Sequence, residues 1–240
     1  AGLINYQQLI DTLLLGYGTA GTPGFLHSAS VLANPATQEY ARLTPEEAMQ
    51  KLTDLGFSRG SDGIYVDGEG NRLEFEFLTY SDNPIRLRAS ELVAQDLRAG
   101  GFAIKLLSMD GEALVQRVWP DFDVSQGRNY QMSIFGWSAP VAAQARLGSL
   151  LHSDPGLGTL NLSGYANDEV DRLTEEAAIT SNDEERLELF HAVQEELAND
   201  LPLITLFYLD GIFAYRPAAH DDWVFMAGQG IINKASFLTR

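Results

Sequence analysis

The chain of 240 residues contains no cysteine. A disulfide framework and a thiolate metal site are therefore both excluded. It also lacks any uncharged apolar stretch approaching the roughly 18 residues of a membrane-spanning helix. No basic segment followed by an apolar run opens the sequence, so no signal peptide is predicted within it. A secretion signal, if the protein has one, would precede these residues.

Basic residues are scarce: 16 Lys and Arg stand against 33 Asp and Glu, a net charge of -17. This balance argues against nucleic acid and against anionic membrane surfaces as partners. Twelve of the acidic residues fall between 167 and 200, where Arg172 and Arg186 are the basic residues. Such a run could hold a divalent cation, but two amphipathic helices with solvated outer faces explain it more simply. A strongly acidic surface is also compatible with a saline habitat.

What is present indicates a globular α/β domain, since 45% of the residues are hydrophobic and 10% are aromatic. Thr44, Pro45 and Glu47 form a capping box at the start of a helix that Gly56 ends. A helix over 84–99 lies between a strand at 73–79 and another at 102–107. This strand–helix–strand unit predicts a parallel pair with a crossover. The turn at 67–71 predicts a hairpin between 64–66 and the strand that follows.

The second half predicts two helices and a strand. Asn167 opens an acidic helix, and 183–199 has the clearest helical periodicity of the chain. Pro202 ends that helix. Residues 203–208 then form a predicted strand that is too apolar to be exposed on both sides. After Pro217 the pattern weakens.

The segment from Tyr130 to Asp171 is the most informative for function. Met132, Ile134 and Phe135 predict a buried strand that delivers Trp137 to a loop, and a long irregular segment follows. An aromatic residue at the carboxyl end of a strand, before such a segment, is how α/β folds build ligand sites. The alternative is a core tryptophan beside an ordinary loop.

Several motifs together resemble the solute-binding proteins of peptide/nickel-type ABC importers (solute-binding family 5). They occur in the family's order: INYQQLIDTLLLGYG, LTPEEAMQKLTDLGF, NPIRLRASELVAQDLRAGGFAIKLLSMDGEALVQRV, FGW, GYANDEVDRL and SNDEERLELFHAVQEELANDLPLITLFYLDGIFAYRP. No single motif is diagnostic, but the ordered set covers nearly the whole chain. The resemblance implies one lobe of a class II periplasmic-binding-protein-like fold, with a mixed sheet flanked by helices.

The resemblance also implies a domain organisation. Family members are normally about twice as long and close two lobes around a ligand. We therefore expect residues 1–215 to form the C-terminal ligand-binding lobe and 216–240 a return segment toward a missing N-terminal lobe. The apolar spacing of residues 3–14 predicts that the sequence starts inside a helix, which favours a fragment. The implied partners are a peptide or small-molecule ligand and an ABC permease, and the implied location is periplasmic or extracytoplasmic.

Within this lobe, Trp137 is the first candidate for a ligand contact, because its ring can stack on a planar group and its N–H can donate. Ser138 and Ala139 would add hydrogen bonds, mainly from the backbone. Tyr80 and Tyr17 could reach the same rim, although packing with the hydroxyl in water explains each tyrosine more simply. Binding without chemistry is expected, with no cofactor.

The sequence departs from the peptide-binding members of the family at one point. Those members typically carry an aspartate soon after the GW element, which pairs with the α-amino group of the peptide. Here residues 138–143 read SAPVAA, and no acid follows until Asp154. A buried ammonium without a partner costs several kcal/mol. Peptide remains the first expectation for the cargo, and oligosaccharides, opine-like or modified peptides and nickel chelates are the alternatives.

Three other functions remain open. Residues 136–140, GWSAP, come close to a G-x-S-x-G nucleophile elbow, so a serine hydrolase that uses Ser138 is conceivable, but the Pro at the last position argues against it. His152 and Asp154 are a weak metal-binding pair. A receptor-coupled sensor would bind ligand in the same way and dock to a signalling protein instead of a permease. We therefore expect a binding protein that is not an enzyme.

Overall fold

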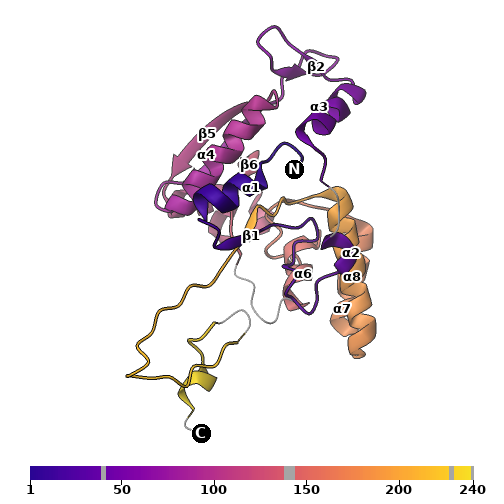
Figure 1. Cartoon of the computed structure of the whole chain (residues 1–240). Coiled ribbons are helices and arrows are strands. Elements are labelled where there is room, and N and C mark those ends of the chain that lie inside the picture. The colour runs from indigo at the N-terminus through magenta and orange to yellow at the C-terminus, as the bar shows by residue number, and fades with distance from the viewer. Residues whose placement is uncertain (39–41, 138–143, 227–229, 239–240) are drawn as a thin grey trace.

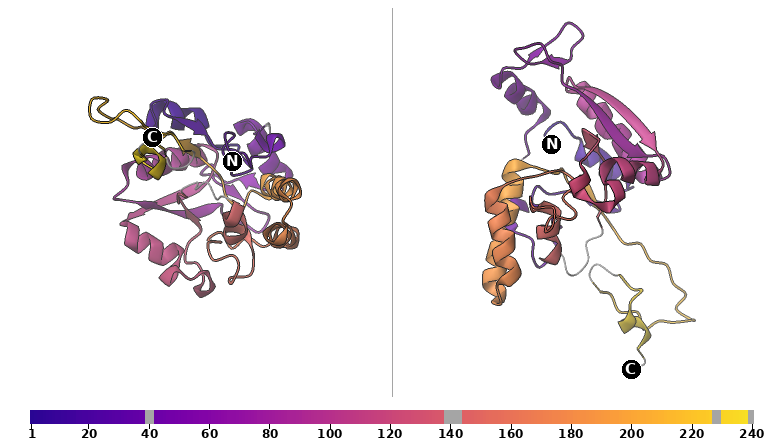
Figure 2. Two further views of the ribbon diagram at one scale, coloured as in Figure 1. Left: turned by 90° about the horizontal axis from the view of Figure 1, so that it is seen from below. Right: turned by 180° about the vertical axis from the view of Figure 1, so that it is seen from behind.

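A three-stranded sheet and a group of helices make up the body of the molecule in a computed structural model (Figure 1). The structure describes residues 1–38, 42–137, 144–226 and 230–238. The sheet has the order β5-β4-β6. The helices α6, α7 and α8 gather on one side of it, and Figure 2 shows α7 and α8 almost end-on from below. The architecture is α/β, as predicted.

The central strand β4 (Glu74–Tyr80) pairs in parallel with β5 (Ala103–Met109) and with β6 (Met132–Ser133). The crossover between β4 and β5 is α4 (Pro84–Ala99), so the predicted strand–helix–strand unit is confirmed. The side chain of Asn83 accepts the backbone N–H of Arg86 at 3.0 Å and caps α4. The turn that follows contains Gly101, whose φ of +94° favours glycine.

Helices cover both faces of this sheet. On one face Ser90 of α4 hydrogen-bonds through its Oγ to Oγ1 of Thr79, at 2.8 Å. On the other face Tyr80 lies against Gly111, the first residue of α5 (Gly111–Val118). Successive strand residues point to opposite faces, and Leu78 and Thr79 are both fully buried. The main apolar cluster therefore forms around β4.

A second apolar cluster lies between α6 (Gln144–Leu151), α7 (Asp168–Ile179) and α8 (Asp183–Asp200). Asn167 caps α7 and Asn182 caps α8, each accepting two backbone N–H groups. The first turn of each helix carries three acidic residues, which the positive end of the helix dipole stabilises. The interpretation of the acidic run as two helices is thus confirmed.

The N-terminal part of the chain wraps this body. It contains, in order, α1 (Tyr6–Gln8), the π-helix η1 (Leu9–Leu13), β1 (Gly18–Ala20), α2 (Pro35–Gln38), α3 (Pro45–Asp54), β2 (Ser58–Arg59) and β3 (Tyr65–Val66). The capping box at Thr44 and Glu47 is present. The helix predicted over 3–14 begins later, after its cap Asn5. The predicted hairpin is reduced to a bridge between Val66 and Arg72, because β3 pairs with β2.

The last part of the chain is less regular. After the 3-10 turns η2 (Pro120–Phe122) and η3 (Val124–Gln126) and the helices above, β7 (Phe207–Leu209) pairs antiparallel with β1. The prediction of a buried strand over 203–208 was wrong in extent. Its partner β1 has only three residues, and Ile204 is 42% exposed. Parallel and antiparallel pairings both occur, but in separate sheets.

Beyond Leu209 the chain extends away from both layers (Figures 1 and 2). This tail contains the 3-10 turn η4 (Lys234–Phe237) and a small cluster of its own. There the ring of Trp223 meets the rings of His220, at 4.7 Å, and Phe237, at 5.7 Å. Ile212 and Phe225 of the tail are strongly exposed.

A buried glutamine ties the N-terminal segment to α8. Gln194 is fully buried, and its Oε1 accepts the backbone N–H of Asn34 at 2.9 Å. Its Nε2 donates to the carbonyls of Leu32, at 2.7 Å, and Phe190, at 3.0 Å. All of its hydrogen-bonding groups therefore have partners, as a buried amide requires.

We predict that Gln194→Glu lowers the free energy of unfolding by about 3 kcal/mol at pH 7. The carboxylate oxygen in the place of Nε2 would face the carbonyl oxygens of Leu32 and Phe190 and could donate to neither. The loss should shrink toward pH 4, where a protonated Glu can donate one hydrogen bond. Urea unfolding at both pH values measures it. Gln95→Glu on the exposed face of α4 is the matched control, and an equal loss there would contradict the explanation.

Candidate functional site

The candidate site lies at the carboxyl edge of the parallel sheet. There β4 ends at Tyr80, and β6 continues into residues 134–137. The backbone N–H of Ile134 still donates to the carbonyl of Leu78 at 3.1 Å. After that bond the chain leaves the sheet, so Gly136 and Trp137 stand just beyond the strand ends. This is the edge at which open parallel sheets place ligands.

Trp137 packs against both apolar clusters, that of the sheet and that of the helices. It is half-buried, and its ring lies 5.0 Å from the ring of Phe135, at an interplanar angle of 47°. The side chain therefore connects the sheet to the helical layer, and it also lies at the predicted site. The alternative, a tryptophan with a structural role, is thus supported. The ligand contact of Trp137 stays a prediction.

The other predicted site residues are placed very differently. Tyr80 is 7% exposed and belongs to the core around β4, and burial raises the pKa of its hydroxyl. Tyr17 is 58% exposed and precedes β1. Within the described residues no ring contact joins Tyr17 to Tyr80 or Trp137. Ser138 and Ala139 lie outside the described residues, so their predicted role stays a prediction.

The sequence analysis missed Arg86, which the structure brings to this edge from the first turn of α4. Its guanidinium carbon lies 4.5 Å from the centre of the Tyr80 ring and 5.9 Å from that of Phe135. A signal was available, because a basic residue three positions after the cap of a crossover helix must lie near the carboxyl end of the preceding strand.

Two shallow depressions lie elsewhere, at the amino edge of the sheet. One of about 560 Å³ is lined by residues of β4, β5 and the segment 128–131, and one of about 400 Å³ adjoins it around Ile104 and Lys105. In the first, Glu76 pairs with Lys105 at 2.9 Å and with Arg117 at 3.5 Å. These charges satisfy one another, and the depressions do not coincide with the predicted site.

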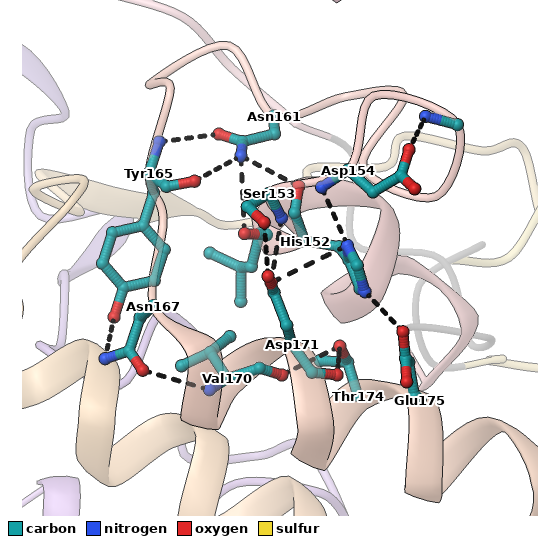
Figure 3. Close-up of polar contacts among 12 residues, drawn as sticks. His152, Ser153, Asp154, Asn161, Tyr165, Asn167, Val170, Asp171, Thr174 and Glu175 are labelled. Carbon is teal, nitrogen blue, oxygen red and sulfur yellow. Dashed lines mark hydrogen bonds and ion pairs between the residues drawn. The ribbon is translucent and has the colours of Figure 1, made fainter.

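Figure 3 shows the polar cluster around His152, the residue whose position beside Asp154 suggested a weak metal pair. The backbone N–H of Asp154 donates to Nδ1 of His152 at 3.0 Å. The other ring nitrogen, Nε2, therefore carries the proton and donates to Glu175 at 3.1 Å. Asp171 accepts from the backbone and hydroxyl of Ser153. These bonds attach residues 152–154, which begin the loop between α6 and α7, to α7.

Asn161 fastens the rest of the same loop. It is buried, and its Nδ2 donates to the carbonyls of His152, at 3.0 Å, and Tyr165, at 2.8 Å (Figure 3). Its Oδ1 accepts the backbone N–H of Tyr165 at 3.1 Å. The cluster is thus a set of internal hydrogen bonds that shapes the loop. Within the part of the chain that the structure describes, no group of three or more metal-ligating side chains is arranged to hold an ion.

Tyr165 and Asn167 then connect the loop to the end of α8. The Tyr165 hydroxyl donates to Asp200 at 2.6 Å, and Nδ2 of Asn167 donates to the same oxygen at 3.0 Å. These two bonds lower the pKa of Asp200, while burial and the neighbouring carboxylate raise that of Tyr165.

The fold and the position of this edge define a class: an α/β lobe of a periplasmic-binding-protein-like molecule. The family model for bacterial extracellular solute-binding proteins, family 5 (middle part), matches residues 1–156. The chain therefore belongs to this family of solute-binding proteins. None of the helices that the structure describes is long and apolar enough to cross a membrane.

Individual relatives agree with this assignment. The oligopeptide-binding protein AppA of Bacillus subtilis is 26% identical over 167 residues, which are 68% of this chain and 29% of that protein. NikZ of Campylobacter jejuni, solved with Ni(L-His), aligns over 87% of this chain and 40% of its own, at 23% identity and a TM-score of 0.73. A mannohexaose-bound binding protein of Thermotoga maritima reaches a TM-score of 0.75 at 19% identity, with the same shares covered. The chain thus spans less than half of each.

We predict that Trp137→Ala lowers the free energy of unfolding by about 3 kcal/mol without any ligand, because it opens a cavity between two apolar clusters. Tyr17→Ala should change it by less than about 0.5 kcal/mol, because that ring is largely in solvent. Denaturant unfolding of both variants tests the difference. Equal effects would mean that Trp137 does not join the layers.

We predict that Tyr165→Phe raises the pKa of Asp200. A carboxyl whose pKa is depressed on folding stabilises the folded state above its unfolded pKa of about 3.9, and this contribution is lost as the pH falls through the folded pKa. The difference in free energy of unfolding between wild type and variant should therefore be largest at pH 7 and should decrease below about pH 4. NMR titration of the Asp200 carboxyl, with the exposed Tyr17→Phe as control, measures the shift directly. An unmoved Asp200 would refute the assignment.

Proposed function

We propose that this chain forms the ligand-binding lobe of the extracytoplasmic substrate-binding component of an ABC importer. Cargo is held between this lobe and a second one and is then delivered to a membrane permease. Membership of the solute-binding family supports this proposal, together with a sheet edge that presents an aromatic ring between two packed layers. The relatives bind solutes and are not described as enzymes, so we propose binding without catalysis.

In this proposal residues 1–215 make up the lobe and 216–240 return toward the second lobe. The tail supports this division, because it leaves the body after Leu209 and exposes apolar side chains such as Ile212 and Phe225. Such residues are usually covered in a complete protein. Closure of two lobes requires that the ligand prefers the closed state.

Peptide or peptide-like cargo is the class that we propose first, because AppA, a relative at 26% identity, is an oligopeptide-binding protein. Non-peptide cargo is the alternative, since residues 138–143 contain no acid for a free α-amino group. The solved neighbours that carry Ni(L-His) and mannohexaose illustrate how widely this fold varies its ligand.

A thermal-shift screen on the two-lobed protein tests the proposal. The panel contains short peptides with free and with acetylated N-termini, oligosaccharides and nickel chelates. A ligand at one hundred times its dissociation constant should stabilise the protein by about 2.7 kcal/mol. We expect peptides to shift the transition and acetylation to matter little, because residues 138–143 contain no acid for the ammonium.

The other outcomes are equally informative. Peptides that bind only with a free N-terminus would show that another carboxylate replaces the missing one. A shift by oligosaccharide or chelate alone would replace peptide by that cargo. Hydrolysis of an ester or peptide that disappears in Ser138→Ala would favour the serine hydrolase, and a panel without any effect would overturn the binding function.

A further inference from the structure

His152 is a buried titratable side chain that the proposed binding function does not use. It is 5% exposed and follows the last residue of α6, where its backbone N–H donates to the carbonyl of Gly148 at 2.9 Å. Both ring nitrogens have partners, because Nδ1 accepts the backbone N–H of Asp154 and Nε2 donates to Glu175 (Figure 3). Neither nitrogen keeps a lone pair for a metal ion, and the ring is neutral in this arrangement.

The bond to Nδ1 positions the turn that follows His152. This turn is built around Asp154, whose carbonyl accepts the N–H groups of Leu157, at 3.0 Å, and Gly158, at 2.7 Å. The Oδ1 of Asp154 accepts the N–H of Gly156 at 2.7 Å. Gly158 lies so close to His152 that a Cβ atom would come within 1.9 Å of the His152 carbonyl oxygen. The imidazole therefore holds the one N–H group, that of Asp154, from which the rest of the turn is organised.

The charged groups that face the imidazole, within the described residues, are carboxylates. Oε1 of Glu175 lies 3.1 Å from Nε2, and Oδ1 of Asp171 lies 3.7 Å from Nδ1. Both come from α7, whose arginine, Arg172, pairs with other glutamates of the same helix. The carboxylate of Asp154 accepts from Gly156 instead. A second proton on the ring would thus enter a negatively charged place, at the end of α6 where the helix dipole also favours a cation.

From this arrangement we infer that His152 is a pH-sensitive switch, which holds the turn after α6 at neutral pH and releases it in mild acid. Histidine is the side chain that ordinarily gains and loses a proton between pH 5 and 8. A proton taken up from solvent binds to Nδ1, because Nε2 already carries one. Nδ1 then becomes a donor, and the carboxylate of Asp171 becomes its acceptor. The N–H of Asp154 loses its partner, whereas the bond from Nε2 to Glu175 stays.

The switch acts on the connection between two helices. His152 ends α6, which begins directly after residues 138–143 in the sequence, and both of its carboxylate neighbours belong to α7. Release of the turn therefore loosens the connection at the far end of the helix that follows the predicted ligand segment. The switch is independent of the cargo, because none of its groups belongs to the predicted ligand contacts.

NMR of the two-lobed protein without ligand tests the switch. The 15N shifts of the His152 imidazole should show a proton on Nε2 alone at pH 8 and on both nitrogens at pH 5. Over the same range the Asp154 amide should lose about tenfold in hydrogen-exchange protection, corrected for the intrinsic pH dependence of exchange. The amide of Val193, in the core of α8, should keep its protection.

Three variants separate the switch from a general effect of acid. In His152→Asn the side-chain oxygen can still accept the N–H two residues later but cannot titrate, so the loss at Asp154 should disappear. Glu175→Gln keeps an acceptor for Nε2 but removes a charge, and it should move the midpoint of the change to lower pH. His27→Asn is the matched control and should change nothing at Asp154, because Nδ1 of His27 also accepts the N–H two residues later, from Ala29 at 3.0 Å.

Several results would overturn the switch. They are a proton on Nδ1 at pH 8, a ring that stays neutral down to pH 5, and a loss at Asp154 that persists in His152→Asn. Unchanged protection at Asp154 after the ring gains its second proton would show that the imidazole does not hold the turn. An equal loss at Val193 would mean acid unfolding instead of local release. The wild type and Glu175→Gln, on an exposed side chain, decide the question even where His152→Asn does not fold.

Discussion

The parallel pairing of β4 with its two neighbours is the constraint on which the rest of the structure depends. Because all three strands run the same way, their carboxyl ends meet at one edge. Every element that follows a strand must therefore start there. That single fact brings the first turn of α4 and the segment after β6 together, although about fifty residues separate them in sequence. Leu78, fully buried between the covering helices, shows how completely β4 is enclosed.

The sequence predicts well those features that local chemistry decides. Helix starts at Thr44, Asn83 and Asn167 follow from side chains that accept N–H groups two or three residues away. Glycines and prolines mark most of the helix ends for equally local reasons. The crossover unit was predictable as well, because a strand, a helix and a strand in succession have essentially one arrangement.

Features that depend on distant partners were not predictable. The strand expected over 203–208 is short because β1 offers only three residues for pairing, which no local pattern reveals. The neighbours of Arg86 were missed for the same reason. Tyr80 ends β4 and Phe135 follows β6, and only the pairing of these two strands places both rings beside one guanidinium. Trp137 was predicted as a candidate ligand contact from its position after a strand. Its packing against the helical cluster was not predicted.

Trp137 connects the stability of the lobe to the ligand binding that we propose. A side chain that packs against both layers has already lost its rotamer freedom before a ligand arrives. The ligand stacking that we propose for Trp137 would therefore cost less ordering entropy than stacking on a free side chain, which is the advantage of a preorganised site. The same packing makes the residue hard to replace, because any change to the contact surface also changes the joint between the layers.

The net charge of -17 and the individual charges at the sheet edge act over different distances. The acidic residues of α7 and α8 include exposed ones such as Glu169 and Asp183, and salt screens such charges beyond about 8 Å under physiological conditions. A half-buried guanidinium such as that of Arg86 is screened less. The net charge therefore acts on the approach of a charged solute, whereas the charges at the sheet edge act on it at contact. A protein can therefore combine an acidic surface with a site of different local charge, because the interactions at contact are the least screened ones.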